Sequence, residues 1–389
     1  MNKMGTAYHH HNMCNDSLFS FGAIADVQCG DLDDRDIPTL PKRYYRGALS
    51  NLGDAVNFWN ERSQRPSFVL QLGDVLDGFN VARGGKDQSR QVLGNVLKEC
   101  SGFKGEFHHA WGNHEFYNFT RLELLNSPLF SGKKYLKQCH PRAYKRFLCQ
   151  ETHLNLLGSD SCQRILQDGT VKNLVSPHGI NDETTPAYYD FSPFKGFRFV
   201  LLDTFEISTL GYSNVDCPER EAAHKILKVH NKNKFLNDFS GLEGKDRRFC
   251  SYNGGISNRQ LQWLKDVLCR ACNHQEKVIV FGHVPIYPEV SLDDCLVWNY
   301  QDVLSILQSN QCVIATLFGH THQYRHLTDE TGIHHFVLPG VVECQPGSNG
   351  FLTFDMSAEG MVVHRAGETL PLTLEYRKVN ITMDSLNNI

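Results

Sequence analysis

The architecture of this chain is set by residues 67–78, which read Ser67-Phe68-Val69-Leu70-Gln71-Leu72-Gly73-Asp74-Val75-Leu76-Asp77-Gly78. The first six are mostly apolar and predict a buried strand over Ser67–Leu72. Gly73 and Asp74 follow where that strand ends, and a glycine lets the backbone come close to a site. A carboxylate at the end of a buried strand is therefore the first candidate for chemistry.

Four further segments repeat this design of an apolar run followed by residues that can bind a metal. They are Asp26-Val27-Gln28 after the predicted strand Leu18–Ala25, Gly112-Asn113-His114-Glu115 after Glu106–Trp111, His283-Val284-Pro285 after Lys277–Gly282, and Gly319-His320-Thr321-His322 after Cys312–Phe318. One such segment could arise by chance. An ordered set at strand ends predicts a two-metal hydrolytic centre.

The predicted strands alternate with helices, which favours α/β layering with the site at the carboxyl ends of the strands. Helices are expected over Tyr45–Glu61, near Gln88–Cys100, from Ser257 onward and over Tyr300–Leu307, and a further strand over Phe197–Asp203. Ser257 and Gln260 have the spacing of a capping box. Three short strands near the end of the chain suggest a second sheet, at His334–Leu338, Phe351–Phe354 and Met361–His364.

The remaining segments set the expected domain organisation. Residues 1–17 are polar and predict a flexible tail, and residues 18–389 predict a single domain. Two polar stretches, near 126–187 and 206–255, are interpreted as insertions or long loops of that domain.

Composition excludes several classes of function. Hydrophobic residues are 41% and charged residues 21%, as in a soluble globular protein, and the net charge of −4 gives no basic footprint for nucleic acid. No apolar run approaches about 20 residues, so no membrane span is expected. The 13 cysteines have no regular spacing, which favours a reducing, cytoplasmic location. A monomer acting on small molecules is the expected state.

The candidate ligands combine oxygen and nitrogen donors without a thiolate. Asp26 and Gln28 alternate along an extended chain and can face one ion, and a carboxylate such as Asp74 can bridge two ions. The other donors are the amide oxygen of Asn113 and the imidazoles of His283, His320 and His322. This set favours Mn²⁺ or iron, with Zn²⁺ and Mg²⁺ as alternative occupants.

Two divalent ions about 3.5–4 Å apart would acidify a bridging water and clamp the oxygens of an in-line displacement. The leaving oxygen then needs a proton or charge neutralisation. His114, beside Asn113, is the predicted proton donor, and Asp77 is the predicted carboxylate that orients it. Four other histidines (His108, His109, His334 and His335) are interpreted as structural.

A nucleotide substrate would need an aromatic side chain to stack on its base. Tyr287, Trp298 and Phe205 follow the relevant strand ends, although packing in the core is the favoured alternative for each. Leu210 and Cys295 are further loop candidates for substrate binding.

These motifs resemble those of the calcineurin-like metallophosphoesterase superfamily. The resemblance implies a two-sheet α/β sandwich flanked by helices, with a dimetal site at the strand ends. It assigns Asp26, Gln28, Asp74 and His322 to one ion and Asp74, Asn113, His283 and His320 to the other, with His114 as the catalytic histidine and Asp77 as its partner. The chain departs from the superfamily at Gln28, where histidine is usual. It also departs from protein phosphatases at Gly78, where they carry a phosphate-binding arginine.

Longer stretches resemble a narrower family, the manganese-dependent ADP-ribose/CDP-alcohol diphosphatases. They are residues 19–28, 70–74, 111–119 and 295–300. The resemblance implies hydrolysis of ADP-ribose to AMP and ribose 5-phosphate, and of CDP-choline and CDP-glycerol to CMP and a phosphorylated alcohol. The residues alone indicate only a phosphoester or phosphoanhydride hydrolase. A phosphomonoesterase, a cyclic-nucleotide phosphodiesterase and a catalytically silent scaffold therefore stay open as alternatives.

Overall fold

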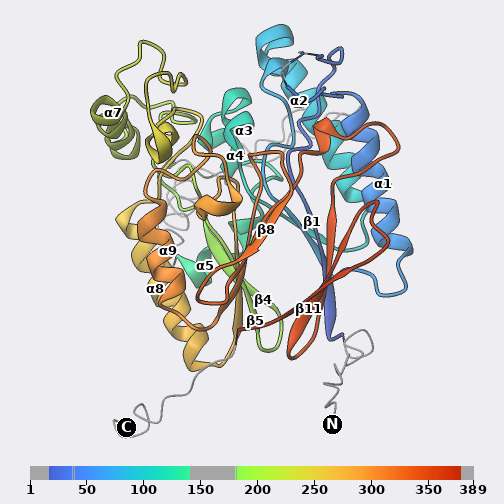
Figure 1. Ribbon diagram of the computed structural model, residues 1–389. Coiled ribbons are helices and arrows are strands. Elements are labelled where there is room, and N and C mark those ends of the chain that lie inside the picture. Colours follow the sequence, from blue (N-terminus) through green and yellow to red (C-terminus); the bar gives the residue numbers. More distant parts are fainter. Residues whose placement is uncertain (1–16, 37, 39, 141–179, 181, 378–389) are drawn as a thin grey trace, which may run out of the picture.

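The computed structural model describes residues 17–36, 38, 40–140, 180 and 182–377, and it consists of two sheets packed face to face with helices outside them (Figure 1). This confirms the predicted two-sheet sandwich flanked by helices. The predicted tail, apart from Ser17, and most of the first predicted insertion lie outside the described residues.

The first sheet has six strands in the order β12-β11-β10-β1-β2-β3. Their bounds are β1 Phe19–Ile24, β2 Phe68–Gln71, β3 Glu106–His109, β10 Leu352–Met356, β11 Gly360–Arg365 and β12 Leu372–Glu375. Strands β1, β2 and β3 are parallel, so their carboxyl ends share one edge of the sheet. The last three strands of the chain are antiparallel to their neighbours and complete the sheet on the other side of β1.

The second sheet has six strands in the order β4-β5-β6-β7-β9-β8. Their bounds are β4 Tyr189–Phe194, β5 Phe197–Leu201, β6 Lys277–Phe281, β7 Val313–Phe318, β8 Arg325–Thr328 and β9 His334–Val337. Strands β5, β6, β7 and β9 are parallel. The expectation that the last short strands form a sheet of their own is wrong, because β9 pairs with β7 whereas β10 pairs with β1.

Long helices cover the outer faces of the sandwich. Helices α1 (Gly47–Glu61) and α2 (Phe79–Ser101) lie beside the first sheet, and α8 (Asn258–Asn273) and α9 (Tyr300–Gln308) beside the second (Figure 1). The short elements are α3 Asn113–Asn118, α4 Arg121–Leu125, α5 Leu136–Cys139, η2 Ser131–Tyr135, η3 Gly244–Arg248, η4 Pro288–Val290 and η5 Val341–Glu343. Within the described ranges, no helix has the length and apolar character needed to cross a bilayer.

Two helix predictions need correction. Helix α2 starts nine residues earlier than the predicted Gln88, and Gly85 breaks its regular geometry with a φ of 68°. Ser257 caps α8 as predicted by accepting a hydrogen bond from the Gln260 amide, but the capping box is only half formed. The Gln260 side chain instead donates to the Asp203 carbonyl and to Glu206, because these buried acceptors lie at the end of β5.

The segment 206–255, interpreted as an insertion or long loop, contains helix α7 (Pro218–His230). Proline at the first helical position and Glu219 and Glu221 in the first turn are helix-start signals. Its buried face is small and consists of Ala223 and Leu227, so the apolar periodicity was too weak to predict it.

An aromatic core joins the two sheets. The ring of Phe21 in β1 stacks on Phe354 with centroids 4.6 Å apart and meets Phe199 of the second sheet edge-on at 5.1 Å. All three side chains are fully buried. Burying each such ring contributes about 2–3 kcal/mol, so these contacts fix how the two sheets face each other.

Buried neutral imidazoles should make the fold acid-sensitive. His108 stacks on Phe191 at 3.8 Å and is only 2% exposed, and burial lowers its pKa to about 3. Burial likewise lowers the pKa of His109 to about 4. Because the unfolded chain takes up these protons near pH 6.5 and the folded chain does not, stability present above pH 6.5 is lost as the pH falls. At pH 5 each of these imidazoles should lower the free energy of unfolding by about 2 kcal/mol relative to its value above pH 6.5.

Urea denaturation at pH 7 and pH 5, with a chelator present, measures this loss. His108→Phe keeps a ring in the aromatic stack. In this variant the free energy of unfolding should differ less between pH 7 and pH 5 than in the unchanged protein. The exposed His274, replaced by asparagine, is the matched control and should change nothing. If the loss of stability between pH 7 and pH 5 is the same in His108→Phe as in the unchanged protein, His108 is not a source of the acid sensitivity.

Candidate metal centre

The predicted ligands meet where the carboxyl ends of strands from both sheets come together. Asp26, Asp74 and Asn113 follow β1, β2 and β3, whereas the three imidazoles follow β6 and β7. The His320 amide donates to Asp26 Oδ2 at 2.9 Å, which ties the loop after β7 to the loop after β1. The site therefore belongs to both sheets equally.

The backbone at the predicted ligands is unusual. Among the described residues, six that are not glycine have a positive φ, namely Asp26, Gln28, Asp74, Gln275, His320 and His322. Five of these six are predicted ligands. Such left-handed conformations cost of order 1–3 kcal/mol each and cluster at functional sites. The local fold is thus strained where the sequence predicts metal binding.

Two glycines allow the ligands to approach each other closely. A Cβ atom at Gly112 would lie 2.1 Å from Asp74 Oδ1, and one at Gly73 would lie 2.5 Å from His283 Nδ1. Gly73 also has a φ of 97°. Both positions require glycine because a side chain would occupy the space of a ligand.

Three of the donors assigned to one ion lie close together. His283 Nε2 lies 3.4 Å from Asp74 Oδ2 and 3.1 Å from His320 Nδ1. One donor atom from each residue lies within 4.8 Å of the other two. The fourth predicted donor, Asn113, is the first residue of α3, and the next amide, that of His114, donates to Asp74 Oδ1 at 2.8 Å.

The donors predicted for the other ion also lie together. His322 Nε2 is 3.4 Å from Asp26 Oδ1. Gln28 Nε2 is 3.0 Å from His322 Nε2 and 3.2 Å from Asp74 Oδ2. The oxygen of Gln28 instead accepts a hydrogen bond from Arg43 at 2.9 Å. A ligand role for Gln28 therefore requires its amide to turn so that the oxygen faces the other donors.

Each of the three imidazoles is held through its second nitrogen. His283 Nδ1 lies 2.7 Å from the Leu72 carbonyl oxygen. His320 Nε2 lies 2.9 Å from Asn253 Oδ1, and His322 Nδ1 lies 2.7 Å from Glu343 Oε1. Acceptors at these positions place the ring proton on the outer nitrogen and leave the inner one free to ligate, which is the usual arrangement around metal-binding histidines.

Buried oxygens without partners test whether metal ions fit here. Asp26 Oδ1 and Asn113 Oδ1 are both buried and have no hydrogen-bond partner. A buried unsatisfied oxygen is costly, and a cation would satisfy it. Together with carboxylate and imidazole donors, these atoms fit two divalent ions of the manganese, iron or zinc type.

The carboxylates make the pocket attractive to positive charge. Burial acts to lower the pKa of His283, but the neighbouring Asp74 outweighs it and raises that pKa to about 9. Burial also acts to lower the pKa of His322, but the neighbouring Asp26 outweighs it and raises that pKa to about 9. Because ligation needs the neutral imidazole, protons and metal ions compete for these nitrogens.

Glu115 supports the centre and was missed as a functional residue. Its buried carboxylate accepts hydrogen bonds from the amides of Gly112 and Asp74 through Oε2 and of Val75 through Oε1, each at 2.7 Å. It therefore fixes the turn after β2 against the start of α3. The capping-box position of Glu115 in α3 was the available signal.

His114 faces the centre and lies beside its predicted partner. Its Nδ1 accepts a hydrogen bond from the Gly78 amide at 2.8 Å and lies 3.4 Å from Asp77 Oδ2. In the neutral ring the proton is therefore on Nε2, which lies 4.0 Å from Asp74 Oδ2. This nitrogen is the one turned toward the metal ligands.

The predicted substrate-binding residues have mixed positions. Phe205 and Trp298 are buried, so the structure supports the core alternative for both, and neither ring face is open to a nucleobase. Cys295 is also buried. Tyr287 and Leu210 are partly exposed, with the Tyr287 ring stacked on His335 at 4.1 Å.

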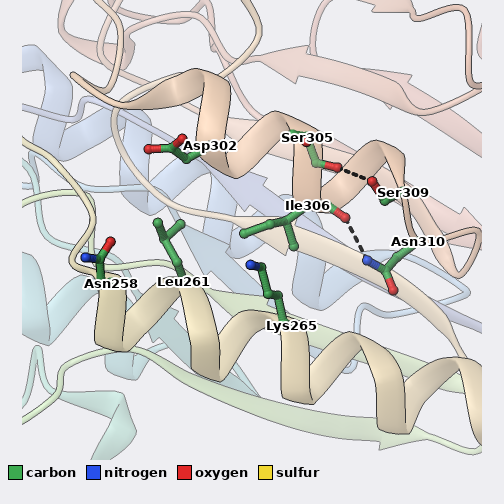
Figure 2. A pocket seen from close by; sticks show the side chains of 8 residues that line it. All are labelled: Asn258, Leu261, Lys265, Asp302, Ser305, Ile306, Ser309 and Asn310. Atoms are coloured by element: carbon green, nitrogen blue, oxygen red, sulfur yellow. Dashed lines mark hydrogen bonds between the residues drawn. The ribbon is translucent and has the colours of Figure 1, made fainter.

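A separate surface pocket lies between α8 and α9 (Figure 2). It is lined by Asn258, Leu261, Lys265, Asp302, Ser305, Ile306, Ser309 and Asn310. None of the predicted ligands or substrate-binding residues reaches it. We therefore do not connect this pocket with the metal centre.

Comparisons with known proteins agree with this geometry. The family described as Calcineurin-like phosphoesterase matches residues 203–324. Curated proteins called "Manganese-dependent ADP-ribose/CDP-alcohol diphosphatase" are similar over nearly the whole chain. The human protein is 36% identical over 94% of each chain, and the Xenopus tropicalis protein is 39% identical over 92% of this chain and 94% of its own.

A solved structure shows the same similarity. The crystal structure of a dimetal phosphatase from Danio rerio has a TM-score of 0.75 and 35% sequence identity, covering 93% of this chain and 100% of its own. At this level of identity and coverage, the chain belongs to the family of manganese-dependent ADP-ribose/CDP-alcohol diphosphatases, hydrolases within the calcineurin-like phosphoesterases.

Proposed function

We propose that the protein hydrolyses the diphosphate bond of ADP-ribose and of CDP-alcohols such as CDP-choline and CDP-glycerol. The products would be AMP or CMP together with a phosphorylated sugar or alcohol. The convergence of carboxylate, amide and imidazole donors around Asp74 is the observation that carries this proposal. The curated relatives are named for the same activity.

The donors divide between two divalent ions, with manganese favoured for activity. Asp26, Gln28, Asp74 and His322 would hold one ion, and Asp74, Asn113, His283 and His320 the other. When bound, the ions would supply positive charge for the diphosphate and acidify the attacking water. Leu72, Asn253 and Glu343 orient the imidazoles from outside, so the nitrogens are in place before substrate arrives.

His114 would serve the leaving group. Hydrolysis forms one phosphorus–oxygen bond to water and breaks the bond to the bridging oxygen, which leaves with negative charge. His114 Nε2 faces the ligands and can donate a proton to that oxygen or stabilise its charge. The Gly78 amide holds the opposite side of the ring through Nδ1, and Asp77 Oδ2 lies 3.4 Å from the same nitrogen.

The test is a comparison of substrates with the purified protein. With Mn²⁺ present, ADP-ribose should give AMP and ribose 5-phosphate, and CDP-choline should give CMP and phosphocholine, when products are separated by chromatography. Treatment with a chelator should abolish turnover, and added Mn²⁺ should restore it.

Three outcomes would contradict the proposal. Release of inorganic phosphate from a simple monoester, with both diphosphates untouched, would favour a phosphomonoesterase, and turnover of a cyclic nucleotide alone would favour a phosphodiesterase. Stoichiometric metal without hydrolysis of any phosphate ester would favour a scaffold.

The cytoplasmic location, monomeric state and single-domain organisation remain predictions from the sequence.

A further inference from the structure

Tyr117 is an exposed aromatic residue beside the metal centre, and the hydrolysis proposed above does not use it. It is the fifth residue of α3, one turn after Asn113, and its ring centroid lies 5.2 Å from that of His114. Because side chains of a helix lean toward its N-terminus, the phenol is directed back toward Asn113. Its Oη accepts a hydrogen bond from Asn113 Nδ2 at 3.4 Å. The hydroxyl of Tyr117 therefore lies beside a predicted metal ligand.

The turn after β2 holds the Tyr117 ring in this place. A Cβ atom at Gly78 would lie 2.7 Å from Tyr117 Cδ2, so a larger residue there would push the ring aside. The amide of the same glycine donates to His114 Nδ1. Gly78 thus seats both the imidazole proposed as proton donor and the ring next to it. Tyr117 is nevertheless 39% exposed, whereas Phe205 and Trp298 are buried, so a bound substrate can reach it.

The phenol of Tyr117 has a proton that is free to donate. A tyrosine hydroxyl can accept a hydrogen bond and donate one. Tyr117 accepts from Asn113, but none of the described residues accepts a hydrogen bond from it. The contact with Asn113 is longer than the usual range of about 2.7–3.2 Å, so it contributes little to holding that ligand. What the hydroxyl can offer is a donor for a group that is not part of the protein.

The position beside His114 determines which substrate oxygen this donor can meet. In the proposed hydrolysis His114 serves the oxygen that leaves, so the group that carries this oxygen lies next to the His114 ring. In a diphosphate that group is a second phosphoryl, which bears charged oxygens. In a simple phosphate ester it is an uncharged alcohol or phenol. Because hydrogen bonds to charged oxygens are the stronger class, a phenol at this position favours a diphosphate.

We propose that Tyr117 is a specificity-determining residue that donates a hydrogen bond to the second phosphoryl group of a diphosphate substrate. It keeps its proton throughout, so it takes no part in the bond that forms or the bond that breaks. It distinguishes diphosphates from esters whose leaving group is an alcohol or a phenol. This inference rests on the proposed function, since it concerns the substrate class of the same centre.

The test compares Tyr117→Phe with Tyr135→Phe and the unchanged protein. Both substitutions remove only a hydroxyl group. Tyr135 is also partly exposed, but it lines a pocket with Phe68 and Glu106. These two residues begin β2 and β3, at the ends of the strands opposite the predicted ligands. Tyr135→Phe is therefore the matched control and should behave like the unchanged protein in each measurement.

Binding is measured by calorimetry at saturating Mn²⁺, with AMP and with α,β-methylene-ADP, in which a methylene group replaces the oxygen between the two phosphorus atoms. In Tyr117→Phe the Kd of α,β-methylene-ADP should rise about tenfold, as expected for loss of a hydrogen bond to a charged oxygen, whereas the Kd of AMP should not change. The kcat/KM for ADP-ribose should fall by about tenfold or more. Hydrolysis of bis-p-nitrophenyl phosphate, which has no second phosphoryl group, should be unaffected.

Three results would overturn the proposal. Equal changes in the Kd of AMP and of α,β-methylene-ADP, or no change in either, would show that the Tyr117 hydroxyl does not recognise the second phosphoryl group. Weaker Mn²⁺ binding without nucleotide, followed by electron paramagnetic resonance, with slower hydrolysis of every substrate would show that Tyr117 acts through Asn113. An unchanged protein that binds α,β-methylene-ADP no more tightly than AMP would show that no such recognition exists.

The binding comparison separates this inference from the proposed function. If the unchanged protein hydrolyses neither ADP-ribose nor CDP-choline, the proposed function fails, and the two Kd values still decide the role of Tyr117. If it hydrolyses both and Tyr117→Phe weakens the two ligands equally, only the inference about Tyr117 fails.

Discussion

Replacing Asp74 with asparagine should reduce hydrolysis of ADP-ribose by about 10³-fold or more, because metal ions supply several kcal/mol of transition-state stabilisation. Elemental analysis of the purified variant should find fewer than two Mn²⁺ ions per chain. Asp74 is 1% exposed and is the carboxylate shared by both proposed ions. An amide keeps its size but removes the charge that would bridge them.

Asparagine is the informative replacement because the Asp74 backbone has a φ of 56°. Asparagine tolerates this left-handed conformation, whereas alanine would add strain and confuse loss of metal with loss of fold. Asp355→Asn is the control, since this partly buried carboxylate pairs with Arg62 and His364, away from the predicted ligands. Full metal content and turnover in Asp74→Asn would refute the shared-carboxylate assignment.

His114→Ala should have the second-largest effect, but through a different step. Removing a general acid or base lowers turnover by about 10²–10⁴-fold. Because His114 is not among the proposed ligands, the variant should retain both Mn²⁺ ions, which elemental analysis would measure alongside kcat. The melting temperature should change little, since the side chain forms one hydrogen bond, from the Gly78 amide.

His364→Ala is the matched control for this variant. His364 also lies beside a carboxylate, with Nε2 2.7 Å from Asp355 Oδ2, but it belongs to β11 and contacts no predicted ligand. It should hydrolyse ADP-ribose at the normal rate. Loss of metal in His114→Ala would show that His114 acts as a ligand, and unchanged turnover would show that it has no chemical role.

The strands that deliver the site could be predicted because burial and local sequence act together there. Strands β1, β2, β6 and β7 are interior strands, and β3 is an edge strand beside β2. Their apolar runs end where the predicted ligands begin. Parallel pairing then brings the carboxyl ends to one edge. The same physics that buries these strands also makes their ends recognisable in sequence.

Two of the edge strands, β8 and β12, could not be predicted in this way. The exposed patterns of β8 and β12 carry no continuous apolar run, since an edge strand packs on fewer neighbours. Local sequence also could not predict that the last strands of the chain are divided between the two sheets. Pairing of β10 with β1 joins segments more than 300 residues apart, and only the folded core decides it.

The outer residues of the centre were missed for a related reason. Asn253, Glu343 and Arg43 act through long-range contacts with His320, His322 and Gln28. None of them stands in a motif with fixed spacing. A single polar residue in a loop gives no signal until the fold places it beside a ligand. The sequence therefore identifies the residues that would ligate the ions more readily than the residues that orient those ligands.

The division of the centre between two sheets makes enzyme activity a reporter of complete folding. The amino-terminal portion of the chain supplies the carboxylates and amides that are proposed as ligands, and the portion after β5 supplies the three imidazoles proposed as ligands. A nascent chain leaving the ribosome could pair β1, β2 and β3 long before His283 is synthesised, yet it would carry only four of the seven proposed donors. We therefore expect high-affinity metal binding only after the second sheet has docked against the first.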